Sequence, residues 1–439
     1  MTSVLGDFFE LQRGTTYKSA LLGQPGPVLL GLGSIARNGG FKGDKLKTYG
    51  GPCDPRHLLG PGEIYVSLKD VTQSADLLGA VARVPAHIPS GRLTQDTVRL
   101  VFKTESAPRT YLYWLMQTPQ YREYCRAHST GTTNLGLARE DFLGFGVPPL
   151  DREREWVVDL VQDIEDKIEL NRRMNETLEA LAQAIFRDWF VDFGPVRRKK
   201  SGATDPVTIM GGLTLDPAGA VELDRLFPDA FGDDEMPVGW KLLPLSDVAD
   251  QCKGTVNPQN SPDATFEHYS LPAYDSRQEP ALDPGITIKS NKVPLPAGAV
   301  MLSKLNPEIP RVWIPNDHAG VPQVASTEFL VFKPKPGCGR GLLYFMLCDP
   351  TVRQVLEGMV TGTSKSHQRI SPPALLQTNL IVGQPEAFAA FHVITEPMLR
   401  RILALRAENR TLAETRDYLL PRLISGEVRV GAPPLEIGA

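Results

Sequence analysis

The sequence contains few cysteines, and they are scattered along the chain. Five occur among 439 residues, and no two form a CxxC pair. They are Cys53, Cys125, Cys252, Cys338 and Cys348. An odd number of cysteines without paired spacing argues against a disulfide framework and against a cysteine-ligated metal site. We therefore expect no bound metal and a reducing, cytoplasmic environment.

Long apolar segments are also missing. No uninterrupted apolar stretch approaches the roughly 18 residues that a membrane-spanning helix needs. The N-terminal segment MTSVLGDFFELQRG lacks the basic stretch followed by an apolar one that marks a signal peptide. With 41% apolar and 22% charged residues, the composition is typical of a soluble globular protein long enough for two or three domains.

The chain has no excess of positive charge. Lys and Arg number 47 against 51 Asp and Glu, which gives a net charge of −4. Tight binding to nucleic acid by the isolated chain is therefore not expected, because neutralising phosphates requires clustered cations. Two segments are locally basic: residues 37–47 (RNGGFKGDKLK) and residues 358–370 (GMVTGTSKSHQRI). Either segment could bind phosphate or could simply be a solvated loop.

Motifs for catalysis are missing as well. VLLGLGSIA at 28–36, followed by Asp54, resembles a dinucleotide-binding turn, but turn residues follow where that site needs a helix. No D/N-PP-F/Y/W tetrapeptide, the signature of adenine methyltransferases, occurs. GMVTGTSKS at 358–366 does not fit the GxxxxGK[ST] phosphate loop, and the seven histidines form no HExxH pair. The sequence therefore predicts a chain that catalyses nothing by itself.

An internal repeat is present. Four pairs of segments match in the same order, at offsets of 236, 231, 231 and 234 residues. The pairs are GEIYVSL (62–68) with GAVMLSKL (298–305), YLYWLMQTPQYREY (111–124) with LLYFMLCDPTVRQV (342–355), TGTTNLGL (130–137) with TGTSKSHQRI (361–370), and KIELNRRMNETLEAL (167–181) with RILALRAENRTLAET (401–415). One order and nearly one offset indicate a duplication of the whole chain.

Each half combines a β-rich part with a long helix. Short β-branched runs between Gly and Pro predict strands in the first part, and small helices are expected near 109–127 and 340–357. The segment 155–191 contains no Gly or Pro and predicts a helix roughly 55 Å long. A second helix is expected over about 386–424, started or kinked by Pro397.

Both predicted helices have a seam of positions at alternating steps of three and four, most of them apolar. The positions are Val161, Ile164, Ile168, Asn171, Asn175, Leu178, Ala182, Ile185 and Trp189 in the first helix, and Ile402, Leu405, Asn409, Leu412, Arg416, Leu419 and Leu423 in the second. Such steps predict a coiled coil, in which Asn175 and Asn409 would fix the register. The alternative is two ordinary amphipathic helices packed on separate cores.

Two segments resemble signatures of a known family. KIELNRRMNETLEALAQAIFRDWFVDFGPVR (167–197) resembles the central conserved region of type I restriction-modification specificity subunits, and YLLPRLISGEVRV (418–430) resembles their C-terminal signature. PLPAGAVMLSK (294–304) and STGTTNLGL (129–137) are similar to their target recognition domains. The resemblance covers nearly the whole chain, although the recognition domains match only loosely.

The resemblance implies an α+β fold with two β-rich target recognition domains and an internal pseudo-two-fold repeat. Two long antiparallel helices would form a coiled coil that separates the domains. The expected parts are target recognition domain 1 (1–150), a central conserved helical region (151–194), a linker with at most one short helix (195–238), target recognition domain 2 (239–384), a C-terminal conserved helical region (385–430) and a tail (431–439).

The resemblance also implies a function in phage defence. The chain would be the DNA-binding specificity subunit of a type I restriction enzyme, recognising an asymmetric bipartite target on double-stranded DNA. Two methyltransferase subunits and two motor-nuclease subunits would join it. S-adenosylmethionine, ATP and Mg would be bound by those partners, so this chain itself needs no cofactor. Two alternatives stay open: the specificity subunit of an orphan methyltransferase without a nuclease, and a self-contained S-adenosylmethionine-dependent DNA methyltransferase.

Contacts to bases require Arg, Lys, Asn, Gln, Ser, Thr or similar donors on loops that enter the major groove. In the first half the candidates are Arg37, Asn38, Lys42, Lys45, Lys47, Lys69, Thr132, Thr133 and Asn134. In the second half they are Lys289, Lys292, Lys304, Asn306, Arg311, Ser364, Lys365, His367 and Arg369. Each could instead have a purely structural role in a turn or at the end of a strand.

Overall fold

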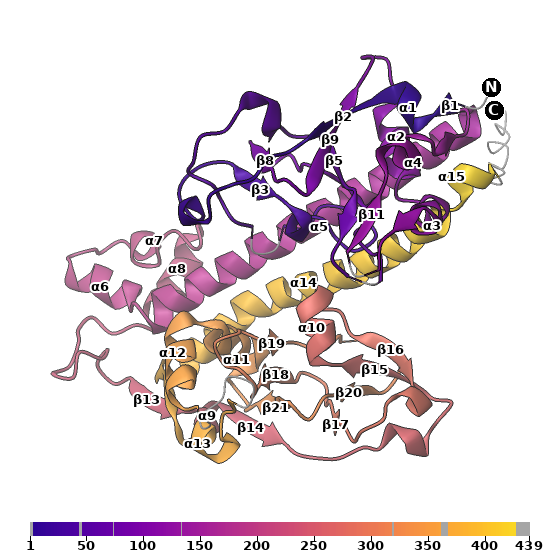
Figure 1. Ribbon diagram of the computed structural model, residues 1–439. Helices are drawn as coiled ribbons and strands as arrows, with labels where there is room; N and C mark the ends of the chain where they lie inside the picture. The colour runs from indigo at the N-terminus through magenta and orange to yellow at the C-terminus, as the bar shows by residue number, and fades with distance from the viewer. Residues whose placement is uncertain are drawn as a thin grey trace, which may run out of the picture. The chain divides into compact units, whose positions relative to one another are not determined.

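The computed structural model describes residues 3–43, 46–72, 74–132, 134–317, 320–360 and 368–426. Within these ranges, no helix is both long enough and apolar enough to cross a membrane. The chain forms two compact units. Unit 1 comprises Met1–Leu170 together with Asn409–Ala439, and unit 2 comprises Asn171–Glu408. Each unit contains a β-rich domain and part of two long helices, α5 and α14 (Figure 1).

The β-rich part of unit 1 is built on a four-stranded antiparallel sheet in the order β2-β9-β5-β7. Smaller sheets are β3-β8-β4, β10-β11-β6 and β1-β12. Its strands are β1 (Ser3–Val4), β2 (Phe9–Arg13), β3 (Val28–Leu30), β4 (Leu58–Leu59), β5 (Ile64–Ser67), β6 (Lys69–Asp70), β7 (Val81–Arg83), β8 (Gly91–Leu93), β9 (Thr97–Phe102), β10 (Ser129–Thr130), β11 (Leu135–Leu137) and β12 (Gly146–Val147). Its helices are α1 (Leu5–Phe8), α2 (Arg109–Leu115), α3 (Pro119–Ala127) and α4 (Arg139–Leu143), with short 3-10 turns at Ser19–Leu21, Leu32–Ser34 and Pro55–His57.

Unit 2 contains a corresponding antiparallel sheet in the order β14-β21-β18-β19. It also contains the sheets β16-β15-β20-β17 and β13-β22. Its strands are β13 (Lys241–Pro244), β14 (Ala249–Cys252), β15 (Thr265–Tyr269), β16 (Ala281–Pro284), β17 (Val293–Pro294), β18 (Val300–Ser303), β19 (Val312–Trp313), β20 (Gln323–Ala325), β21 (Phe329–Pro334) and β22 (Asn379–Gly383). Its shorter helices are α6 (Gly194–Lys200), α7 (Pro206–Ile209), α8 (Pro217–Asp224), α9 (Leu245–Val248), α10 (Leu271–Arg277), α11 (Gly339–Cys348), α12 (Pro350–Gly358) and α13 (Pro372–Gln377), with 3-10 turns at Pro258–Asn260 and Gly285–Thr287. The predicted mixture of helices and sheets is confirmed.

The two long helices lie close to their predicted ranges. Helix α5 is Arg152–Phe190, and α14 is Pro385–Leu419. Pro397 lies inside α14, so it does not start that helix. The chain leaves α14 just before Pro421, a residue that disfavours a helical conformation in the residue preceding it. The short helix α15 (Arg422–Ser425) follows.

Within each unit, the segments of α5 and α14 are antiparallel. In unit 1, Arg416 donates to Glu165 at 2.7 Å and Arg154 donates to the carbonyl of Leu423 at 2.9 Å. In unit 2, Asn171 donates to Glu408 at 3.0 Å and Arg406 donates to Glu179 at 2.6 Å. In both units the partner number falls as the α5 number rises, and this is the order of antiparallel helices.

The positions at steps of three and four face inward on both helices. All of them are buried or half-buried, including Asn175 and Asn409, each 9% exposed. Arg416 is polar, and its place on this face is explained by the ion pair with Glu165. A coiled coil along the full length of the helices, the register role of the two asparagines and the internal duplication stay predictions.

The segment 195–238 differs from the expected linker. It contains three helices, α6, α7 and α8, whereas the sequence predicted at most one short helix. Its apolar side chains belong to the core of unit 2; they include Val196, Ile209, Met210, Ala220 and Phe227. The prolines that suggested a linker stand at the first helical positions, where no N–H is needed. Asp205 and Asp216 cap α7 and α8, so Asp-Pro here begins helices.

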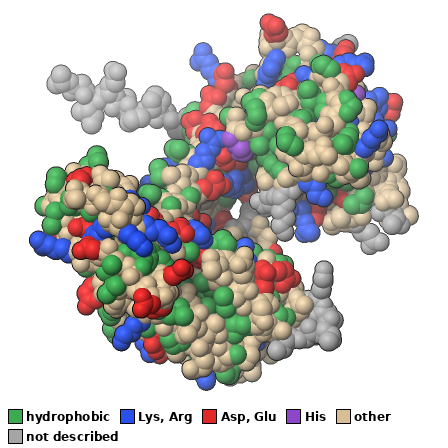
Figure 2. Space-filling model, turned by 90° about the vertical axis from the view of Figure 1, so that its left-hand side faces the viewer, with side chains coloured by type: hydrophobic (Ala, Val, Ile, Leu, Met, Phe, Trp, Pro, Cys, Tyr) green, Lys and Arg blue, Asp and Glu red, His purple; other side chains and the backbone are tan. Residues whose placement is uncertain are grey.

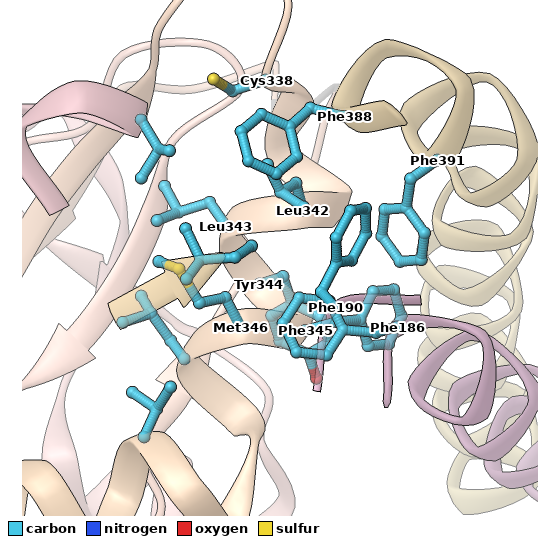
Figure 3. Close-up of a cluster of buried hydrophobic side chains, with 14 of the residues drawn as sticks. Phe186, Phe190, Cys338, Leu342, Leu343, Tyr344, Phe345, Met346, Phe388 and Phe391 are labelled. Atoms are coloured by element: carbon cyan, nitrogen blue, oxygen red, sulfur yellow. The ribbon is translucent and has the colours of Figure 1, made fainter. Parts of the chain in front are cut away.

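The core of unit 2 includes a cluster of aromatic rings between helices. Phe186 and Phe190 of α5 meet Phe391 of α14, with ring centroids 5.9 and 5.5 Å apart. Phe345 of α11 contacts Phe391 at 6.2 Å. Figure 3 shows these rings pointing toward one another, beside Leu342 and other buried side chains of α11. The cluster attaches the β-rich domain of unit 2 to both long helices.

Candidate nucleic-acid interface

In unit 1, a small sheet brings three of the candidate residues together. Strand β6 pairs with β11, so Lys69 lies opposite Gly136. Strands β10 and β11 form a two-stranded ribbon whose loop contains Thr132 and Asn134. All three candidate side chains are exposed. Gly131 (φ +98°) permits the tight loop, because a Cβ there would lie 2.4 Å from the carbonyl oxygen of Asn134. Thr133 lies outside the described residues.

A turn after β6 is held by a buried carboxylate. Asp70 is fully buried and accepts hydrogen bonds from the backbone N–H groups of Leu77 at 2.6 Å and Thr72 at 2.7 Å. Burial alone would raise the pKa of Asp70, but these backbone donors hold it below its usual value. The turn is therefore fastened from within by a charged group that does not face solvent.

The basic loop of unit 1 attaches to this turn. The backbone N–H of Asn38 donates to the carbonyl of Asp76 at 2.8 Å, and Arg126 donates to the Asn38 side chain at 2.8 Å. The Arg37 side chain, 84% exposed, lies 3.8 Å from the Asp76 carboxylate. We define site 1 by the five candidates that border the turn. They are Arg37, Asn38, Lys69, Thr132 and Asn134.

Two further candidates of the first half lie on the same loop but do not contact the turn. Lys42 and Lys47 are exposed, and their backbones bond to Ser34 and Leu29. They are therefore not part of site 1. Lys45 lies outside the described residues.

Unit 2 brings together candidates from two distant segments. Leu305 forms an antiparallel bridge with Arg369. The carbonyl of Lys304 accepts from the N–H of Ile370 at 2.9 Å, and the N–H of Asn306 donates to the carbonyl of Gln368 at 3.1 Å. We define site 2 by Lys304, Asn306 and Arg369. Ser364, Lys365 and His367 lie outside the described residues.

Sites 1 and 2 are built in the same way. Ser67, at the end of β5, accepts from the N–H of Lys69 and donates to the carbonyl of the same residue. Ser303, at the end of β18, forms the same two hydrogen bonds with Leu305. The strands keep the same register, since Ser67 pairs with Thr97 and Ser303 with Phe329. Each unit therefore places its candidate residues around the end of the equivalent central strand. Lys69, Lys304 and Asn306 follow that strand directly, and Thr132, Asn134 and Arg369 lie on later segments that pair with the residues after it.

Three candidates of the second half are not part of site 2, and two of them are buried. Lys292 is 6% exposed, and its ammonium donates to the Ser290 hydroxyl at 2.6 Å. Arg311 is 8% exposed and donates twice to Asp275, at 2.7 and 2.8 Å. Both cations are engaged inside unit 2, so we withdraw them as base-contacting candidates. Lys289 is exposed, and its ammonium lies 3.3 Å from the carbonyl of Ile286.

Sequence reasoning missed the acids that accompany the candidate cations. Glu328 accepts from Arg369 at 3.2 and 3.1 Å, and Asp96 lies 3.9 Å from Lys69. Each acid is the residue immediately before a strand, β21 or β9. An acid at matched positions of the two repeats was the signal available in the sequence.

Charges of both signs are mixed on the surface. On the face drawn in Figure 2, Lys and Arg side chains lie among Asp and Glu side chains. Over the part of the chain that the structure describes, no group of three or more His, Cys, Asp or Glu could hold a metal ion. The candidate sites therefore offer hydrogen-bond donors on loops, with modest local positive charge.

Comparison with known proteins connects this arrangement to one family. No protein-family model matches the chain. It is 24% identical over 357 residues to the type I restriction enzyme MjaIX specificity subunit of Methanocaldococcus jannaschii, covering 77% of this chain and 73% of that protein. It is 23% identical over 341 residues to the HindI specificity subunit of Haemophilus influenzae, covering 65% and 69%. The crystal structure of a type I restriction-modification S subunit from M. genitalium has the same fold, with a TM-score of 0.55, 12% identity, and coverage of 96% and 95%.

Proposed function

We propose, for a chain that belongs to the specificity subunits of type I restriction enzymes, that sites 1 and 2 each recognise one half of a bipartite DNA sequence. The observation that carries the proposal is the shared construction of the two sites. In both units, the same serine hydrogen bonds hold the segment that leaves the equivalent central strand, at Lys69 in unit 1 and at Leu305 in unit 2. The polar and basic residues of each site lie on or beside this segment. Two such sites on one chain suit two separate half-sites on a duplex.

The ribbon of site 1 is an element of a kind that recognises DNA. The major groove of B-DNA, about 12 Å wide, admits a two-stranded β-ribbon. Strands β10 and β11 form such a ribbon, with exposed Thr132 and Asn134 in its loop. Asn donates and accepts at the edge of adenine, and Thr can bond to several bases. Lys69 beside the ribbon suits a guanine edge or a phosphate.

The two half-sites are expected to differ in sequence. Site 1 offers Lys69, Thr132 and Asn134, whereas site 2 offers different side chains at its corresponding strand end, Lys304, Asn306 and Arg369. Since different donors favour different bases, the target is an asymmetric bipartite sequence and not a palindrome.

The charge of the chain supports a function within a larger complex. A net charge of −4 provides little general attraction for DNA, so phosphate contacts must come largely from partner subunits. Two methyltransferase subunits, which carry S-adenosylmethionine, bind the chain and modify the recognised DNA. Two motor-nuclease subunits, which use ATP and Mg, join to cleave unmodified DNA. The chain itself supplies the target specificity and does not catalyse.

Methylation mapping tests this proposal. DNA is sequenced for methylated adenine after expression of a type I methyltransferase subunit with the chain, without it, and of the chain by itself. We expect one asymmetric bipartite motif, and only when both proteins are present. Methylation by the chain alone would instead favour a self-contained methyltransferase. A motif that persists without the chain would exclude it as the subunit that determines specificity.

A second measurement separates the two complexes in which a specificity subunit occurs. The motor-nuclease subunit from the same restriction system is added to the purified complex with ATP and unmethylated target DNA. Cleavage that depends on the chain supports a full restriction enzyme. Methylation without any cleavage supports the orphan methyltransferase complex.

A further inference from the structure

Each candidate site contains a cation that faces an acid from the same place in the fold. Asp96 directly precedes β9, and Glu328 directly precedes β21. These strands are equivalent, because each pairs antiparallel with the central strand that ends in Ser67 or Ser303. The acid of unit 1 lies near Lys69, and the acid of unit 2 lies near Arg369. An acid at the same position thus faces a cation in both units. The cations come from different segments, since Lys69 follows the central strand, whereas Arg369 lies opposite Leu305, where unit 1 has Gly136.

The pair in unit 2 has the better geometry. The Nε and Nη2 groups of Arg369 donate to the two carboxylate oxygens of Glu328, at 3.2 and 3.1 Å. Two parallel hydrogen bonds fix the plane of a guanidinium, which a single contact cannot do. Glu328 is itself held by its backbone, since its N–H donates to Ser326 at 3.3 Å and its carbonyl accepts from the N–H of Lys304 at 2.9 Å.

The pair in unit 1 is looser. The ammonium of Lys69 lies 3.9 Å from Asp96, and the two side chains are 55% and 33% exposed, against 42% and 26% for Arg369 and Glu328. An ammonium has no plane for the carboxylate to fix, so Asp96 can only neutralise the charge of Lys69. Any effect of Asp96 should therefore be smaller than that of Glu328.

Stability does not explain why such a pair occurs in both units. Ion pairs between partly exposed side chains contribute on the order of 0 to 1 kcal/mol. Their effect on DNA binding can be larger. A phosphate attracts any cation, whereas a base edge requires donors in a defined direction. A carboxylate next to the cation cancels the attraction to phosphate and leaves a directed donor.

We propose that Glu328 is a positioning residue that makes Arg369 specific for a base edge, by fixing the guanidinium plane and suppressing contact with phosphate. Asp96 acts on Lys69 in the same way and more weakly. The proposal rests on the proposed function, because it assumes that sites 1 and 2 bind DNA. On this proposal, the negative charges of Glu328 and Asp96 increase the specificity of the two sites and lower their affinity for DNA.

The test compares Glu328→Gln and Asp96→Asn with the wild type, in the assembled complex with methyltransferase subunits. The probes are a pool of random-sequence duplexes and a duplex containing the motif found by methylation mapping. For Glu328→Gln we expect tighter binding to the random pool. The slope of log affinity against log salt should steepen by about 0.9, the value for one additional phosphate contact. Discrimination at base pairs of one half-site should fall, while the other half-site is unchanged. Asp96→Asn should lower discrimination at base pairs of the other half-site, by a smaller amount.

Two further variants separate this effect from simple damage to the fold. Glu328→Asp keeps the charge and should retain most of the discrimination. Arg369→Met removes the cation, and adding Glu328→Gln to it should change the salt slope no further. An unchanged salt slope and unchanged discrimination in Glu328→Gln would overturn the proposal, as would lost discrimination with an unchanged slope. If the wild-type complex itself fails to prefer the motif over the random pool, the proposed function is wrong instead.

Discussion

The two units attach their β-rich domains to the long helices with different side chains. In unit 2 the helices contribute aromatic rings, among them Trp189 and Phe391. In unit 1 they contribute aliphatic residues, among them Val157, Val161 and Leu419. The central sheets nevertheless have equivalent strand orders and registers. Equivalent folds therefore do not require equivalent core residues, provided that apolar volume is buried at the same face.

The polar contacts between each β-rich domain and the long helices also differ between the two units. In unit 2 the buried Asp349 accepts from Arg187 of α5 at 2.7 Å, and Arg340 forms ion pairs with Glu396 of α14 and with Asp317. In unit 1 a neutral side chain of α5 forms the main contact of this kind, and His87 lies 3.8 Å from Glu169 of α5 at the surface. Gln162 of α5 accepts from Arg83 and Trp114, at 2.9 and 3.1 Å. Unit 2 should therefore lose more stability than unit 1 when a single contact is removed.

The largest effect is expected from the aromatic cluster. Phe391→Ala should lower the free energy of unfolding of unit 2 by about 4 kcal/mol, since Phe391 is fully buried among four other rings. Val161→Ala, at a fully buried position of unit 1, should cost about 2 kcal/mol. Urea unfolding followed by tryptophan fluorescence measures both. Equal losses would contradict the distinction between the two units.

A smaller effect is expected at the residues that begin α3 and α12. Asp349→Ala removes both the cap of α12 and the partner of Arg187, and should cost about 3 kcal/mol. Thr118, at the equivalent position in unit 1, caps α3 and donates to the carbonyl of Leu115, but its hydroxyl forms no ion pair, so Thr118→Ala should cost about 1 kcal/mol. Both losses are measured by urea unfolding.

Asp349→Asn is the matched control for the ion pair. Asparagine caps a helix about as well as aspartate, so this variant retains the cap and loses only the charge. Asp349→Ala should cost more stability than Thr118→Ala, and this excess measures the ion pair. Asp349→Asn should lose most of that excess. Full stability of Asp349→Asn would show that the pair with Arg187 contributes nothing.

The smallest effect is expected at the neutral contact of unit 1. Gln162→Ala leaves the Arg83 and Trp114 donors without this acceptor and should cost about 1 kcal/mol. Asp166→Asn, at the exposed acceptor of the Gln162 amide, is the control and should change the stability by less than about 0.5 kcal/mol. Thermal unfolding compares the two. A loss above 3 kcal/mol in Gln162→Ala would make unit 1 as dependent on single polar contacts as unit 2.

The long helices could be predicted from the sequence because their signal is local. An uninterrupted stretch without Gly or Pro and regular apolar steps gave nearly the observed bounds of α5. The segment 195–238 was misjudged, since proline marks either a break or the first position of a helix. The Asp-Pro pairs at Asp205 and Asp216 were the overlooked sign of helix starts.

The candidate sites were only partly predictable. The loops around Lys69 and Arg369 were found because basic residues on turns are visible in a sequence. The burial of Lys292 and Arg311 was not foreseen, since their partners Ser290 and Asp275 are set by the local fold of unit 2. The acids Asp96 and Glu328 were missed because an ion pair across strands leaves no local pattern. Their signal is non-local, an acid directly before each of two equivalent strands.

The central claim is that each unit recognises its own half of one DNA target. The most direct test removes the side chains of one site at a time and maps methylated adenine with the methyltransferase subunit present. One variant carries Lys69→Ala with Asn134→Ala, and the other carries Lys304→Ala with Arg369→Ala. We expect the first variant to lose base preference in one half of the motif and the second variant in the other half, with the untouched half retained in each. Loss of preference in both halves from either variant, or in neither half from both, would contradict the claim.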